Sequence, residues 1–331
     1  MILILHGDGS NEGETVLTRI FYATDLHGSE KAFMKLLRAG EFYEASVVIV
    51  GGDITGKMVV PIIRQNDGTY RVNFLGEDKI LKNEGEVEKI QQFIRDGGNY
   101  PYLTDDREME ELAANKDLVD KLFSKLMIER LHEWFKKAEE KLAKRNIKMF
   151  ITPGNDDSFD IDPIFDKFNL VINPEGKVIE IDGYHEMIST GYSNITPWRC
   201  PRDVPEEQLA EKIEDMVSQI KDIKNAVFNF HCPPFDSGLD IAPKLDENFK
   251  PVTGADGFKM IPVGSTAIRK AIETHQPLLS LHGHIHESRG ARLIGRTLCI
   301  NPGSEYGEGI LRGAIINLEQ DKVKGYMLTS G

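Results

Sequence analysis

The sequence has few cysteines, no long apolar run and no excess of positive charge, the features that would allow disulfide cross-links, membrane insertion or nucleic-acid binding. Its 331 residues include three cysteines, an odd number without paired spacing, which argues against a disulfide framework and favours a reducing cytoplasm. No apolar run approaches the roughly 18 residues of a membrane-spanning helix. The apolar start, residues 1–5, also lacks the basic and hydrophobic regions of a secretory signal.

Positive charge is also scarce. There are 40 Lys and Arg residues against 53 Asp and Glu, a formal net charge of −13. Non-specific nucleic-acid binding needs Lys and Arg to replace counterions, so we expect neither nucleic acid nor a membrane as a partner. A phosphate-containing substrate stays open, because a bound metal ion could supply positive charge locally.

The composition that remains is that of an ordinary globular protein, with 40% hydrophobic and 28% charged residues and no internal repeat. Three short, β-branched apolar runs end in polar turns and predict buried strands at 19–24, 46–50 and 147–152. A helical pattern at 29–39 follows the first run. This alternation favours an α/β sheet covered on both faces, with ligands bound where the strands end.

Residues 57–145 do not show this alternation of strand and helix, and we interpret them as an insertion within a single domain spanning 1–331. They predict a β-hairpin with an Asp67-Gly68 turn, a helix at 86–95, and a longer helix at 105–145 with a break near 115–117. The long helix is either an amphipathic helix packed on the core or a cap or dimerisation element beside the site. The insertion could therefore join two copies into a homo-oligomer.

The second half of the chain predicts further short strands and one helix at 205–222. The strands are expected at 178–181, 186–190, 226–230, 277–281, 297–300, 313–318 and 323–328. Residues 248–264 are rich in Gly, Pro and polar residues and predict a loop. Since this loop lies between two candidate site segments, it could form part of a substrate pocket.

Candidate metal ligands follow five of the predicted strands. They occur as D-L-H, G-G-D, G-N-D-D, F-H and G-H-I-H, and comprise Asp25, His27, Asp53, Asn155, Asp156, His231, His284 and His286. Imidazole, carboxylate and amide together suit Mn, Fe or Zn better than Ca or Mg. The set is too large for one ion. Two divalent ions held by such ligands, with a carboxylate such as Asp53 bridging them, can promote in-line displacement at phosphorus.

The five motifs, in this order, resemble those of the calcineurin-like metallophosphoesterase superfamily. The resemblance spans most of the chain and implies a four-layer αββα sandwich with a dinuclear metal centre. By matching positions, Asp25, His27 and His286 would hold the first metal. Asn155, His231 and His284 would hold the second, and Asp53 would bridge the two.

The resemblance also implies an activity. We expect a metal-dependent phosphoesterase that hydrolyses a small phosphodiester or nucleotide-type phosphoester by attack of a metal-bound hydroxide. Asn155 and His231 would stabilise the developing charge. Many members carry His, acting as a general acid, where this chain has Asp156, and Asp156 could fill that role only if its pKa were raised.

Several alternatives remain open at this stage. The protein could be a nuclease, which would need a basic stripe, or a low-turnover metal-binding regulatory or scaffold protein. Arg199 and Arg289 could reach a substrate phosphate or be ordinary surface arginines. His282 and Cys232 lie beside predicted ligands, and we interpret both as structural residues.

Overall fold

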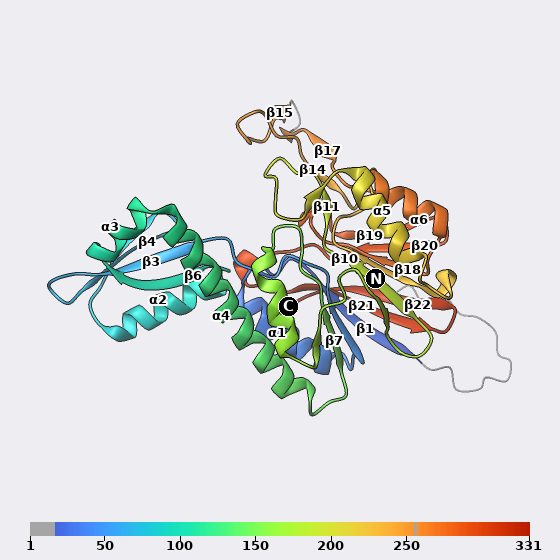
Figure 1. Ribbon diagram of the computed structural model, residues 1–331, viewed down its shortest axis with the longest axis horizontal. Coiled ribbons are helices and arrows are strands. Elements are labelled where there is room, and N and C mark those ends of the chain that lie inside the picture. The colour runs from blue at the N-terminus through green and yellow to red at the C-terminus, as the bar shows by residue number, and fades with distance from the viewer. Residues whose placement is uncertain (1–16, 255–256) are drawn as a thin grey trace.

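The structure is a computed structural model and describes residues 17–254 and 257–331. The apolar start at 1–5 and His6 therefore lie outside the described residues. Two six-stranded sheets stack at the centre of the molecule (Figure 1). The described part of the chain has no helix that combines the length and apolarity needed to cross a bilayer.

The first sheet has the strand order β22-β21-β1-β2-β7-β8. Strands β1, β2, β7 and β8 are parallel, and β21, next to β1, pairs with it antiparallel and continues into the antiparallel edge strand β22. The bounds are Thr18–Ala23 (β1), Val47–Val50 (β2), Lys148–Ile151 (β7), Val171–Ile172 (β8), Arg312–Glu319 (β21) and Lys322–Ser330 (β22). The three strands predicted from the first half of the chain are therefore adjacent and parallel.

The second sheet has the order β19-β20-β18-β13-β10-β9. Its four central strands are parallel, and β9 and β19 are antiparallel edges. The bounds are Val178–Glu180 (β9), Glu186–Thr190 (β10), Val227–Phe230 (β13), Leu279–Leu281 (β18), Gly290–Ile294 (β19) and Thr297–Asn301 (β20).

Three apolar layers hold these elements together. One lies between the sheets and includes Tyr22, Phe150 and Leu279. A second packs the outer face of the first sheet against α1 (Glu30–Phe42), α4 (Lys116–Leu142) and the 3-10 helix η1 (Phe159–Lys167). The third packs the other outer face against α5 (Glu206–Val217) and α6 (Thr266–His275). The predicted four-layer αββα sandwich is confirmed.

Residues of the predicted insertion form a lobe beside the sandwich (Figure 1). Its sheet has the order β5-β4-β3-β6 and its own apolar core, which includes Ile62, Val72 and Ile94. The bounds are Val59–Arg64 (β3), Tyr70–Phe74 (β4), Glu77–Leu81 (β5), Glu84–Asp96 (α2), Tyr100–Asp105 (β6) and Asp106–Ala114 (α3). The hairpin and the helix break are confirmed, whereas β5 and β6 were not predicted. The domain limits, 57–145 within 1–331, stay a prediction.

The predicted loop at 248–264 is wrong in part. It contains β15 (Thr253–Gly254), β16 (Gly257–Phe258) and β17 (Met260–Pro262), and β17 pairs with β14 (Ile241–Pro243). Strands this short leave too few residues for a period-two pattern. The remaining elements are β11 (Ser193–Asn194), β12 (Asp203–Val204), η2 (Ile223–Asn225) and η3 (Tyr306–Glu308).

Replacing Trp134 by alanine is expected to destabilise the fold by about 3–5 kcal/mol. The indole of Trp134 is 1% exposed and stacks on Phe33 from α1, with ring centroids 4.2 Å apart, so its removal leaves a cavity under the first sheet. Urea unfolding measures the change. Trp198→Ala is the matched control, because Trp198 is 65% exposed and should cost under about 1 kcal/mol. A cost at Trp134 no larger than the control would contradict this packing.

Candidate metal centre

The carboxyl ends of the parallel strands of both sheets meet at one edge of the sandwich. Asp25 follows β1, Asp53 follows β2 and Asn155 follows β7 in the first sheet, while His231 follows β13 and His284 follows β18 in the second. The polar ends of strands far apart in sequence thus form one cluster. All seven predicted metal ligands and Asp156 lie in it.

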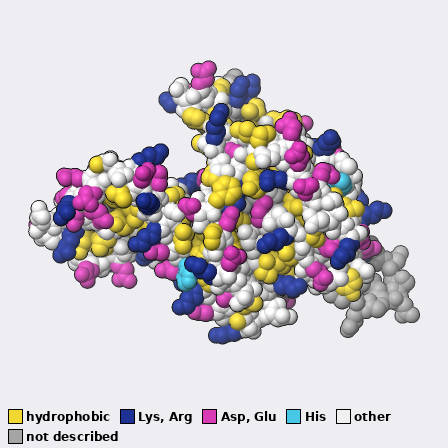
Figure 2. Space-filling view, viewed as in Figure 1, with side chains coloured by type: hydrophobic (Ala, Val, Ile, Leu, Met, Phe, Trp, Pro, Cys, Tyr) yellow, Lys and Arg dark blue, Asp and Glu magenta, His cyan; other side chains and the backbone are white. Residues whose placement is uncertain are grey.

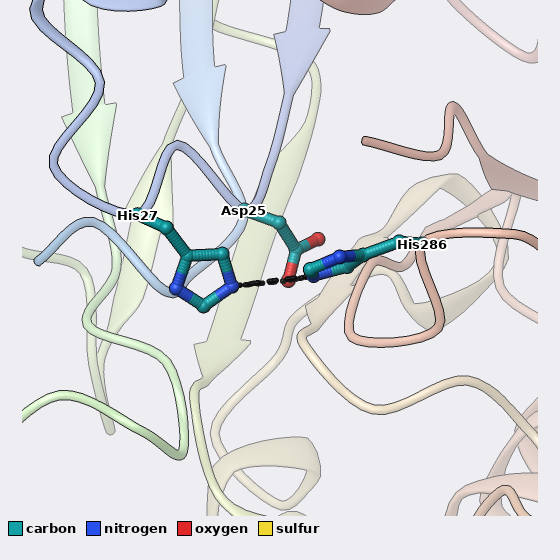
Figure 3. Close-up of side chains that lie close together, drawn as sticks. All are labelled: Asp25, His27 and His286. Carbon is teal, nitrogen blue, oxygen red and sulfur yellow. Dashed lines mark hydrogen bonds and ion pairs between the residues drawn. The ribbon is translucent and has the colours of Figure 1, made fainter. Parts of the chain in front are cut away.

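The first group of possible ligands is Asp25, His27 and His286, whose donor atoms all lie within 4.8 Å of one another. Figure 3 shows the carboxylate of Asp25 lying between the two rings, which come from different loops. His286 Nε2 is 3.3 Å from Asp25 Oδ1 and 3.2 Å from His27 Nε2. Three donors converging on one point are what a metal ion requires.

The second group is Asp53, His231 and His284, with donor atoms within the same limit. Asp53 Oδ2 is 3.3 Å from His231 Nε2 and 3.6 Å from His27 Nε2 of the first group. One carboxylate oxygen therefore faces ligands of both groups. This is the position that a bridging ligand would take.

Asn155 fits the second group by its unpaired oxygen. Its side chain is buried, and Nδ2 donates to Asp203 Oδ1 at 2.9 Å, which fixes the orientation of the amide. Its Oδ1 has no hydrogen-bond partner among the described residues, and neither does His231 Nε2. His231 Nδ1 lies 2.9 Å from the Gly51 carbonyl, which leaves Nε2 free for the cluster. Buried polar atoms without partners are rare, and a metal ion would satisfy both.

Four of the predicted ligands have a strained backbone. Asp25, His27, Asp53 and His284 have φ angles of 53°, 40°, 50° and 65°, in the left-handed region that residues other than glycine seldom adopt. Each such residue costs on the order of 1 kcal/mol or more, and such strain concentrates at functional sites. The loops thus place these side chains at some expense of stability.

The loops also approach one another closely. A Cβ on Gly154 would lie 2.1 Å from Asp53 Oδ1, so only glycine fits beside that carboxylate. Buried Asp157 joins the same two loops, because its carboxylate accepts hydrogen bonds from the backbone N–H groups of Ile54, Thr55 and Gly154. Burial raises the pKa of Asp157 to about 6.

The electrostatics of the cluster favour cations. Burial alone would raise the pKa of Asp53, but the His231 ring outweighs it and holds that pKa well below its usual range. Burial lowers the pKa of His231, yet Asp53 and Asp25 raise it to about 9. Burial lowers the pKa of His27 and of His284 to about 4, which leaves neutral rings able to act as ligands. Two buried carboxylates therefore attract positive charge to a site with free imidazole donors.

Asp156, the candidate catalytic acid, lies at the edge of the cluster. Its backbone N–H donates to Asp53 Oδ1 at 3.0 Å, and its carboxylate is 3.0 Å from Lys57 Nζ. Burial lowers the pKa of Lys57, but Asp156 more than offsets this and the pKa is raised, so the amine is a cation. Lys57 is not among the site residues predicted from the sequence. Its only signal was a basic residue four positions after Asp53.

The lobe also supports the cluster. Buried Arg130 of α4 donates to the carbonyl oxygen of Gly28, next to His27, at 2.8 Å. It also donates to the carbonyl oxygen of Asn99, which precedes β6, at 3.2 Å. The loop that carries the first two ligands is therefore tied to the lobe and to α4.

The other residues considered from the sequence lie elsewhere. His282 is buried, with Nδ1 2.9 Å from the Phe230 carbonyl, and burial raises the pKa of the Cys232 thiol to about 12, so the surroundings of both suit structural roles. Arg199 and Arg289 are exposed and do not line the cavity beside the cluster.

A cavity of about 1320 Å³ opens beside the cluster. His27, Asp53, Asn155 and His284 line one end of it, and Lys57 lies at the same end. Residues of α4, of the connection between β11 and β12, and of the β14–β17 hairpin line the rest. The segment at 248–264 thus contributes to the cavity, as expected.

Glu175, on the segment before β9, makes stability depend on pH. This half-buried carboxylate accepts hydrogen bonds from Thr190 Oγ1 and Gly191 N, and burial raises its pKa to about 7. The folded state therefore holds a proton that the unfolded chain releases from about pH 4.5 upwards, so stability falls as the pH rises towards 7. Because solvent screens part of the effect, we expect a loss of about 2 kcal/mol.

Urea unfolding at pH 5 and pH 8 measures this loss. Glu175→Gln, which keeps an acceptor and cannot ionise, should reduce the difference between the two pH values by about 2 kcal/mol. Glu180→Gln, at an exposed position on β9, should leave it unchanged. An equal response of the two variants would contradict the assignment.

Comparison with known proteins finds a relative in sequence. The chain is 32% identical over 167 residues to the protein MJ1162 of Methanocaldococcus jannaschii, a match that covers 49% of this chain and 68% of that protein. No family model matches the chain.

Two solved structures share the fold. One has a TM-score of 0.55 with 18% identity, and covers 95% of this chain and 99% of its own. The other, TT1561 of Thermus thermophilus, has a TM-score of 0.53 with 13% identity, and covers 96% of this chain and 99% of its own. At these identities the likeness concerns the fold alone.

Proposed function

We propose that this chain, which belongs to the same family as MJ1162 and has the calcineurin-like metallophosphoesterase fold, is a metal-dependent phosphoesterase acting on a small phosphodiester or nucleotide-type phosphoester. The observation that carries the proposal is the pair of ligand groups that share Asp53. Asp25, His27 and His286 would hold one divalent ion, and Asn155, His231 and His284 the other.

Two ions bound there would supply a nucleophile for in-line attack, by lowering the pKa of a coordinated water, and would neutralise the phosphoryl oxygens. Mn, Fe and Zn suit this donor set. The protein's part is to hold the carboxylate of Asp53 between the groups, with the backbone N–H groups of the next two residues, Ile54 and Thr55, bound by Asp157. The buried amide of Asn155 and the ring of His231 would act on the phosphoryl group through the ion that they hold, because Nδ2 of the amide and Nδ1 of the ring pair with Asp203 and the Gly51 carbonyl.

The resemblance gives a histidine at the position of Asp156, and we propose that Lys57 performs its function in this chain. It lies at the cluster end of the cavity as a cation, and Asp156 anchors it. We assign to Lys57 the contact with the phosphoryl or leaving-group oxygen, and to Asp156 the role of holding Lys57 rather than of giving up a proton. Association through the lobe stays a prediction.

Hydrolysis of bis-p-nitrophenyl phosphate and p-nitrophenyl phosphate by metal-stripped protein tests the proposal. We expect no turnover without metal, turnover when Mn²⁺ is added, and a preference for the diester. No turnover with Mn, Fe, Co, Ni or Zn, in protein shown to bind two ions, would overturn the proposal and favour the scaffold alternative. Faster cleavage of single-stranded DNA than of either ester would favour the nuclease.

A further inference from the structure

The cavity is larger than the reaction centre requires. Pockets for small ligands are typically about 300–1,000 Å³, and this one is about 1320 Å³. The cluster and Lys57 occupy one end only. The rest of the cavity offers room for a part of a ligand that does not react.

That remaining part, here called the apolar arm, is lined chiefly by large hydrophobic side chains. They come from three segments and include Phe123, Met127, Ile195, Trp198, Ile261 and Pro262. Ile195 is 55% exposed and Trp198 65% exposed. On the face drawn in Figure 2, hydrophobic side chains gather below the β14–β17 hairpin, on the side towards the lobe. Large apolar side chains left open around one cavity mark a binding surface for apolar groups.

The polar side chains of the apolar arm are mostly engaged within the protein. Thr196 donates to Asp203, and Ser124 donates to Asp160. Glu206 accepts from Ser265 Oγ and from the first N–H groups of α6. Few groups are left to recognise the edge of a base or the hydroxyls of a sugar.

The charges along the apolar arm oppose a second anionic group. Among the described residues, its charged side chains away from the cluster are Lys244 and four acids, Asp120, Asp160, Glu206 and Glu287. A nucleic-acid strand or a polyphosphate would place further negative charge beside these carboxylates. An uncharged apolar chain would meet no such repulsion.

Resting on the proposed function, we infer that the preferred substrate is an amphiphilic phosphodiester with its alkyl chain bound in the apolar arm and its phosphate at the cluster. Water would form the new P–O bond, the P–O bond to one alcohol would break, and that alcohol would leave with a proton. The products are a phosphomonoester and an alcohol. The apolar arm selects the substrate, and the cluster performs the reaction.

A series of p-nitrophenyl phosphodiesters with a common leaving group tests this inference. The Mn²⁺-loaded protein would be assayed below micellar concentrations with the methyl, octyl and thymidine 5′-esters. If each of the seven extra methylenes contributes about half of its full burial free energy of about 0.8 kcal/mol, kcat/KM for the octyl ester should exceed that for the methyl ester by roughly 100-fold. The octyl ester should also exceed the thymidine ester.

Variants locate the effect. Ile195→Ser and Trp198→Ser, at exposed positions that should tolerate the change, are each expected to lower the octyl-to-methyl ratio by roughly fivefold. Leu293→Ser is the matched control, because Leu293 is 70% exposed on β19 and lies outside the cavity. An octyl-to-methyl ratio near one, or a preference for the thymidine ester, would overturn the inference.

Binding separates the inference from the proposed function. Calorimetry would compare octylphosphonate with methylphosphonate on Mn²⁺-loaded protein, and neither is hydrolysed. Tighter binding of octylphosphonate without turnover of any ester would support the apolar arm and overturn the phosphoesterase. Turnover of the esters with equal binding of the two phosphonates would support the phosphoesterase and overturn the apolar arm as a binding site for alkyl chains.

Discussion

Replacing Asp53 by asparagine is expected to lower Mn²⁺-dependent kcat/KM by at least about 10³-fold, because two cations would lose the charge that holds them together. One oxygen of this carboxylate lies 3.3 Å from His231 Nε2 and 3.6 Å from His27 Nε2, so it faces both ligand groups. Asparagine keeps the shape and can still accept from Asp156 N–H. The assay is hydrolysis of bis-p-nitrophenyl phosphate under saturating Mn²⁺.

Two controls accompany this variant. Asp78→Asn, at an exposed position on β5 in the lobe, should retain wild-type turnover. Asp53→Asn without metal should still unfold in one cooperative transition, at a lower temperature than the wild type, because the buried ring of His231 loses its carboxylate partner. If Asp53→Asn retains more than about a tenth of the activity, Asp53 does not bridge the two ions.

Replacing Lys57 by alanine is expected to lower kcat by about 10²-fold, because the variant removes the positively charged side chain assigned to the phosphoryl or leaving-group oxygen. Lys57→Arg should recover part of the loss, whereas Lys244→Ala, at the far part of the cavity, should change kcat little. A loss confined to KM would instead assign Lys57 to ground-state binding of the substrate.

The ion pair of Lys57 and Asp156 adds a second test. If Asp156 acts only through Lys57, Asp156→Asn should lower kcat less than Lys57→Ala does, and the double variant should be no worse than Lys57→Ala alone. A general acid at Asp156 would give additive losses and would change the alkaline limb of the pH–rate profile. The double-mutant cycle therefore decides the role that the sequence left open.

The sequence predicted the cluster well because its signals are local. Each ligand follows a short, buried strand within a few residues, and parallel strands bring such ends to one edge. Lys57 was missed for the opposite reason. A lone lysine after a glycine has no spacing of its own, and only the fold places its amine beside Asp156.

The lobe and the cavity were harder to predict. Strand β5, Glu77–Leu81, has four exposed residues out of five, so burial leaves almost no alternation to detect. Helix α6 was not predicted either. Ser265, which caps it by accepting from Ile268 N–H, is a typical helix-start residue, but the helix has only 10 residues and so shows its apolar period only briefly. The cavity depends on side chains from three segments that are remote in sequence, and no spacing rule relates them.

Anomalous diffraction from crystals soaked in Mn²⁺ tests the central claim most directly. We expect two manganese peaks at the sheet edge. One would be bound by Asp25, His27 and His286, the other by Asn155, His231 and His284, and Asp53 would contact both. A single peak, or two peaks that leave Asp53 or Asn155 without a metal contact, would contradict the dinuclear centre.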